Sequence, residues 1–232
     1  MSKTVGLTDV ISKFIDDFSV GMYTAMPGVV ETVHNGGQDL RVDVLPLFNT
    51  EFADGTIKEP VSIDNIQIMM PGTLDSMVSF PIKKGIPVLL VFCQRDMSGF
   101  RHGNASTYTP EEDRRMSIQD AVAIPGIFPF GLSPNAPTAR VLSHSTNDMV
   151  VSHNIGTSSE CEVRMKPDGT IELTSPIKIK CKSPDMEIES NISVLGNLTQ
   201  SGGTLSSNGV VLDSHTHGGV DRGSGNTNPP NS

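Results

Sequence analysis

The last third of the chain is a series of short segments in which apolar and polar residues alternate. In Glu160–Lys166 the apolar residues are Cys161, Val163 and Met165. The same alternation recurs at Ile177, Ile179 and Cys181, at Met186 and Ile188, and at Ile192 and Val194. Because successive side chains of a strand point to opposite faces, each segment predicts a strand whose apolar face is only two or three side chains long.

Such narrow faces constrain the architecture more than any other feature of the sequence. A single chain of these strands cannot cover its own apolar side, and small isolated sheets are only marginally stable in water. No repeat of about 20–50 residues is present, which argues against a single-chain solenoid. We therefore predict that three identical chains wrap around one axis as an intertwined triple-stranded β-helix over residues 151–212. The alternative is an antiparallel sandwich, which needs more leucine and aromatic residues than this region has.

Composition fits a thin or oligomeric body. The chain has 232 residues, a net charge of −9, 5% aromatic residues and no tryptophan. We find no apolar run long enough for a transmembrane helix and no signal-peptide pattern, so we expect the protein to be made in a cytoplasm. An acidic chain without a basic patch argues against a nucleic-acid partner. The three cysteines lack the spacing of a zinc site and are odd in number, so we expect no disulfide framework.

The N-terminal segment, residues 1–25, predicts a helix and a docking element. Thr8 is a suitable N-cap, and Asp9 suits the first turn. The apolar residues at helical spacing are Val10, Ile11, Phe14, Ile15 and Phe18. This apolar side packs either on the chain's own domain or on a partner subunit.

Residues 26–98 predict an all-β domain. The segments Val29–Val33 and Leu40–Pro46 flank a strong turn signal at Asn35-Gly36-Gly37, and Ile86–Cys93 is a continuous apolar run. About five strands in this length fit an OB-like barrel. The aromatic residues and basic groove of a single-strand-binding barrel are missing. Residues 99–150 are rich in glycine and proline and predict a turn-rich junction.

The pair His215 and His217 near the C-terminus is the candidate metal site. In an extended chain these two side chains share a face, so three chains around an axis would bring six imidazoles together. Six nitrogen donors suit an octahedral transition-metal ion and argue against tetrahedral zinc, calcium or magnesium. A metal-hydrolase site would need further histidine ligands, and the residues after His217 contain none. The alternative is two solvated histidines in a frayed tail.

Residues 215–219 (His-Thr-His-Gly-Gly) and 225–230 (Gly-Asn-Thr-Asn-Pro-Pro) carry a family resemblance. Together with the barrel and the series of short strands, they make the sequence resemble the membrane-piercing central spike of contractile phage tails, the baseplate assembly protein V family. The resemblance implies a homotrimer with an OB-like barrel at its base, a β-helix shaft and a pointed apex at residues 213–232. It also implies that His215 and His217 hold an iron ion at this apex, although the donor set alone also suits other octahedral metals.

The function that the resemblance implies is mechanical. Sheath contraction would drive the spike through the host outer membrane, and the spike would sit in the virion at the tip of the tail baseplate after assembly in the host cytoplasm. The implied partners are a trimeric baseplate hub protein and the tail tube. We expect no enzymatic activity, because a site filled by six nitrogens leaves no position for substrate. The alternative function is a receptor- or carbohydrate-binding trimeric tail fibre or tailspike. It is weakened by the absence of tryptophan and by only two tyrosines, Tyr23 and Tyr108.

Overall fold

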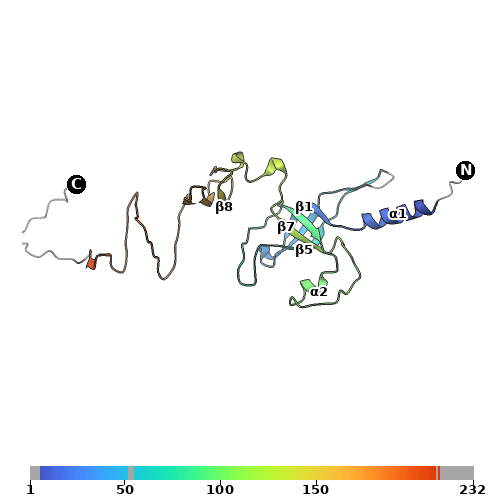
Figure 1. The fold of residues 1–232 in the computed structure, drawn as a ribbon, viewed down its shortest axis with the longest axis horizontal. Helices are drawn as coiled ribbons and strands as arrows, with labels where there is room; N and C mark the ends of the chain where they lie inside the picture. Colours follow the sequence, from blue (N-terminus) through green and yellow to red (C-terminus); the bar gives the residue numbers. More distant parts are fainter. Residues whose placement is uncertain (1–5, 52–54, 213, 215–232) are drawn as a thin grey trace, which may run out of the picture. The chain divides into compact units, whose positions relative to one another are not determined.

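The computed structural model describes residues 6–51, 55–212 and 214 (Figure 1). The fold is mostly β with few helices, as the sequence predicts. Contacts divide the chain into two units, residues 1–178 and 179–232, and each is described here by itself. No helix in the described ranges is both long enough and apolar enough to cross a membrane.

A closed barrel of five strands forms the largest folded part of the first unit (Figure 1). Its strands are β1 (Ala25–Val33), β2 (Arg41–Pro46), β5 (Ile63–Ile68), β6 (Pro87–Phe92) and β7 (Ala121–Pro125). The order around the barrel is β1-β2-β5-β7-β6, and every neighbouring pair is antiparallel except β5 and β7, which are parallel. The predicted five-stranded barrel is confirmed.

Alternating apolar residues build the barrel core. In β6, Val88, Leu90 and Phe92 are buried, while the residues between them are only partly buried. Val42 and Val44 of β2 fill the same interior. A Cβ atom on Gly28 of β1 would lie 2.6 Å from Cγ1 of Val44, so only glycine allows β1 to approach β2 this closely.

The last barrel strand, β7, lies in the segment for which the sequence predicts a turn-rich junction, 99–150. The barrel therefore extends to Pro125, past the predicted boundary at residue 98. The run Ala121–Pro125 is short, contains two alanines and lies among breakers, so local pattern gives little strand signal. Its position is fixed by long-range pairing with β6 and β5.

The connection between β6 and β7 contains α2 (Ser98–Arg101) and is held by buried charges. The guanidinium of Arg114 lies 2.7 Å from Oδ1 of Asp96 and 3.2 Å from Oδ2 of Asp120. Both aspartates are almost fully buried. The Asp120 carboxylate also accepts a hydrogen bond from the Met97 backbone N–H, so the acids order the loop before β7.

Helix α1 (Leu7–Val20) precedes the barrel. Short elements lie between and after the barrel strands: the 3₁₀ turn η1 (His34–Gly37), the hairpin β3 (Thr50–Glu51) and β4 (Ile57–Lys58), and the 3₁₀ turns η2 (Phe130–Leu132) and η3 (Pro137–Ala139). Within η1, Asn35 and Gly36 both have positive φ, as the predicted turn between β1 and β2 requires.

A separate three-stranded antiparallel sheet follows, with order β10-β9-β8. Its strands are β8 (Met149–His153), β9 (Cys161–Met165) and β10 (Ile171–Thr174). In the second unit, β11 (Ser206–Ser207) pairs with β12 (Val210–Val211).

The single chain forms no helix or strand between residues 175 and 205, all of which are described. This differs from the strands predicted at Ile177–Cys181, Met186–Ile188 and Ile192–Val194. The physical reason is that a strand needs a neighbour for its backbone groups, and no other segment of the described chain pairs with these residues.

Candidate functional site

The β8–β9–β10 sheet has one apolar and one polar face. Residues directly opposite each other in the register share a face. The apolar face has two rows, Met149, Met165 and Ile171 in one and Val151, Val163 and Leu173 in the other. In the single chain Val151 is 56% and Leu173 is 59% exposed. The apolar face is therefore largely open to solvent.

The sequence predicts that Cys161, Val163 and Met165 share a face and that this face is the core. The register places the three residues on one face of β9. Within the single chain, however, the most buried residue of the strand is Glu162, on the opposite face. The reason is a set of buried ion pairs that covers the polar face.

Arg140 is the centre of these ion pairs. Its Nη2 atom lies 3.4 Å from Oε1 of Glu160 and 3.2 Å from Oε2 of Glu162, and all three side chains are at least 96% buried. Arg164 pairs with the other oxygen of Glu162. Two arginines thus balance two glutamates, which satisfies the rule that buried charges are paired.

Glu160 is held in its charged form by the backbone. Burial raises the pKa of its carboxyl group, but backbone N–H groups of Gly156, Val141 and Leu142, together with the Arg140 charge, bring the pKa below its usual value. The donors from Val141 and Gly156 lie 2.7 and 3.0 Å from Oε2. These hydrogen bonds hold residues 140–142 against the polar face of the sheet. The apolar face is therefore the one exposed to solvent.

The segment after the sheet is open in a similar way. Among residues 175–204 no backbone–backbone hydrogen bond forms. The apolar side chains that alternate along it are exposed, with Ile177 at 83% and Ile192 at 66%. Backbone donors and acceptors of a folded protein are nearly always paired when they are buried. This segment can therefore bury its apolar residues only if other strands supply the missing hydrogen bonds.

The predicted metal ligands His215 and His217 lie outside the described residues. The described chain leads up to them through the β11–β12 hairpin, where the Leu212 N–H donates to the Leu205 carbonyl at 2.8 Å. Elsewhere in the described part of the chain, no three histidine, cysteine, aspartate or glutamate residues gather where they could hold a metal ion.

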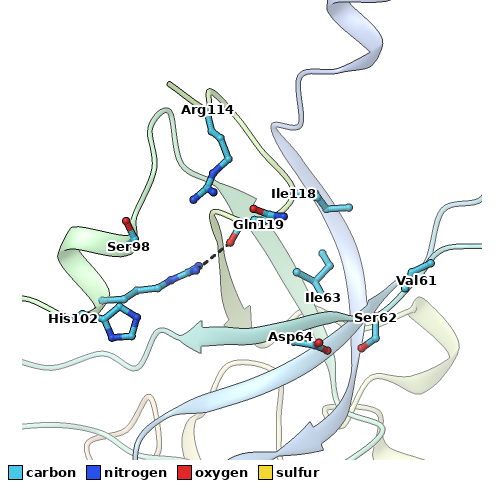
Figure 2. A pocket seen from close by; sticks show the side chains of 10 residues that line it. Val61, Ser62, Ile63, Asp64, Ser98, His102, Arg114, Ile118 and Gln119 are labelled. Atoms are coloured by element: carbon cyan, nitrogen blue, oxygen red, sulfur yellow. Dashed lines mark hydrogen bonds between the residues drawn. The ribbon is translucent and has the colours of Figure 1, made fainter. Parts of the chain in front are cut away.

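A hollow of about 510 Å³ lies beside the barrel (Figure 2). Arg101, His102, Arg114, Ser62 and Gln119 are among its lining residues. The Arg101 guanidinium donates a hydrogen bond of 3.1 Å to the Gln119 backbone carbonyl. Since Arg101 also donates to Ala121 and Arg114 is paired with buried aspartates, both arginines hold the loop between β6 and β7. We therefore assign the hollow a structural role.

Sequence reasoning missed the buried charges around Arg140. Their spacing in the chain, from residue 140 to residues 160–164, follows no helical or strand period, so no local signal predicts them. The alternating pattern did predict the apolar face on the other side of β9.

Two family models match parts of the chain. Residues 26–126 match the phage protein Gp138 N-terminal domain, a range that includes all of the barrel but its first residue. Residues 209–231 match the GpV Apex motif, and this range includes His215 and His217. No curated protein matches the chain.

Proposed function

We propose that this chain, which its Gp138 N-terminal domain and GpV Apex motif indicate to be a gpV-like phage baseplate spike protein, works as a homotrimer that pierces the host outer membrane. The chain is a structural component of the virion tail. Its place at the baseplate tip, its trimeric state, its metal and the piercing action are parts of the proposal.

Two observations carry the proposal: the open apolar face of the β8–β10 sheet, and the exposed apolar residues that alternate along the segment after it. The β8–β10 sheet exposes two rows of apolar side chains, and residues 175–204 form no backbone–backbone hydrogen bonds. Three copies around one axis would cover both: the apolar rows would meet at the axis, and strands of neighbouring chains would exchange backbone hydrogen bonds. This arrangement is a triple-stranded β-helix.

The residues that would face outward in the proposed trimer are polar. Polar residues alternate with the apolar ones along the predicted strands: they are charged at Lys178, Lys180 and Lys182, and uncharged at Asn191 and Ser193. The ion pairs of Arg140 seal the polar face of the sheet with the chain's own residues. Stiffness follows, because interchain strands and a dry apolar axis both resist bending.

His215 and His217 from three copies would hold a metal ion at the apex. Two imidazoles per chain give six nitrogen donors, a set that suits iron and other transition metals that accept octahedral coordination. The ion would supply binding free energy that ties three chain ends together where few apolar residues are available. It would do no chemistry on a substrate, and we propose no enzymatic activity for the protein.

The proposed partners follow from the mechanical role. A trimeric baseplate hub protein and the tail tube would receive the barrel end, and contraction of the sheath would push the apex through the host outer membrane. The shaft is acidic and hydrophilic, which would suit its release from these partners when the sheath contracts.

Native mass spectrometry with metal analysis of the purified protein tests the assembly. We expect a mass of three chains and one iron or similar ion per trimer. The double variant His215→Ala/His217→Ala should lose the ion, whereas the matched variant of an exposed histidine, His102→Ala, should keep it. A folded monomer, or unchanged metal in the double variant, would overturn the proposal.

Phage carrying the double variant test the piercing role. We expect such particles to adsorb to cells normally and to fail to cross the outer membrane. Loss of adsorption itself would instead favour a receptor-binding function.

A further inference from the structure

Helix α1 carries an apolar face that nothing in the described chain covers. Phe14 is 70% and Phe18 is 59% exposed, and Leu7 and Ile11 are also at least half exposed. The rings of Phe14 and Phe18 stack at 6.4 Å between centroids, so they form one continuous surface. An exposed apolar stripe of this kind marks an interaction surface.

The spacing of this stripe identifies the kind of partner. Leu7, Ile11, Phe14 and Phe18 follow one another at intervals of four, three and four residues. This is the d-a-d-a spacing of a heptad, the repeat with which helices wind around copies of themselves. Polar Asp9 and Lys13 occupy outer positions of the same heptad.

The flanking positions favour more than two helices. Val10 and Ile15 stand at the g and e positions beside the a and d residues, and both are exposed. In a two-stranded coil these positions usually carry charged residues, whereas an apolar arc this wide needs a neighbour on each side.

The short link between α1 and the barrel would bring the α1 helices of the proposed trimer close together. The helix ends at Val20, and Tyr23 is already fixed: its backbone N–H donates to the Met116 carbonyl at 3.0 Å, and its ring lies 5.3 Å from that of Phe92. Only Gly21 and Met22 lie between. A helix of 14 residues is only marginally stable alone in water. Three copies held this close to three barrels would have a high effective concentration.

We propose that the α1 helices of three copies pack together as a parallel three-helix coiled coil beside the barrels, with Leu7, Ile11, Phe14 and Phe18 in its core. This inference rests on the proposed trimer and adds to it an N-terminal clamp, far along the chain from the apex. It also means that these phenylalanines are occupied within the spike, so that a hub protein contacts other surfaces.

Disulfide trapping in the full-length protein tests the packing. Ile11→Cys places a thiol at an a position, where copies of the residue face each other across the coil axis, whereas Lys13→Cys places it on the outer surface. A disulfide needs two Cα atoms within about 7 Å. Under mild oxidation at low protein concentration, we expect covalent dimers from Ile11→Cys at least about tenfold above Lys13→Cys and above the parent protein, which controls for the native cysteines.

Native mass measured on the same samples separates the two proposals. Trimers in which Ile11→Cys and Lys13→Cys link equally would overturn the coiled coil and leave the spike proposal standing, because α1 would then face another protein. Monomers would overturn both. As a second variant, Phe14→Asp should lower the melting temperature of the trimer, and an unchanged melting temperature would contradict the clamp.

Discussion

The guanidinium of Arg140 lies 3.2 Å from the carboxylate of Glu162, and both side chains are at least 96% buried on the polar face of the β8–β9–β10 sheet. The pair lies on the polar face of the sheet, which other residues of the same chain cover. It leaves Val151, Val163 and Leu173 on the side that the chain does not cover.

Replacing Arg140 should destabilise the sheet strongly. Arg140→Met keeps most of the side-chain volume but leaves Glu160 and Glu162 buried without their shared cation. Loss of one partner of a buried ion pair costs about 3–5 kcal/mol. We expect a lower melting temperature by calorimetry of the full-length protein, while Arg115→Met, on an exposed arginine, should change it little. Equal melting of the two variants would show that the buried charges contribute no stability.

Acid should weaken the loop between β6 and β7. The backbone N–H of Ser98, with further donors and Arg114, lowers the pKa of Asp96 to about 2. A carboxyl group with a lowered pKa stabilises the fold above its unfolded pKa of about 3.9, and this contribution disappears as the pH falls towards 2. The melting temperature should therefore fall between about pH 4 and pH 2.

The variant Asp96→Asn provides the comparison for the acid effect. It should be less stable than the parent at pH 7 and should lose less stability between pH 4 and pH 2, because it has no proton to bind at this site. Asp64→Asn, on an exposed residue, should follow the parent. A parent and an Asp96→Asn curve that run parallel through the acid range would refute the role of Asp96.

Gly28→Ala should strain the barrel. The added Cβ would lie 2.6 Å from Cγ1 of Val44 and 3.2 Å from the Leu45 carbonyl oxygen, so β1 or β2 must shift. Overpacking of this kind typically costs about 1–3 kcal/mol. Gly131→Ala is the matched control, since its Cβ would meet no atom within 4 Å. Denaturant unfolding should separate the two variants, and equal midpoints would contradict the close approach of β1 and β2.

Ile179→Asp should block assembly without unfolding the barrel. Ile179 is exposed in the single chain, so the change removes no packing there, but in the proposed trimer it would bring three carboxylates to one axis. Lys180→Asp places the same side chain on the predicted outer face and changes the charge by two units per chain instead of one. Native mass should show monomers for the first variant and trimers for the second; trimers of Ile179→Asp would mean that this residue does not face the axis.

The sequence predicted the elements whose signals are local. The Asn35-Gly36 turn and the alternating residues of β2 predict a hairpin, and the structure has it. The apolar run of β6 likewise predicts a buried strand, and Val88 and Leu90 are fully buried.

Features that depend on distant residues could not be read from local pattern. β7 has only five residues, and its place in the barrel depends on pairing with β6 and β5. The ion pairs of Arg140 reach more than twenty residues along the chain to Glu162. The histidines of the candidate metal site lie outside the described residues, so their arrangement stays a prediction.

The absence of backbone–backbone hydrogen bonds in residues 175–204 has a consequence for a newly synthesised copy of the chain. Its barrel is complete within one chain and can fold as soon as β7 leaves the ribosome. In the proposed trimer, residues 175–204 would offer backbone amide groups to proteases and to the edges of other sheets until two further copies pair with them. We therefore expect the yield of intact spikes to rise steeply with the rate of synthesis, because the encounter of three chains competes with degradation.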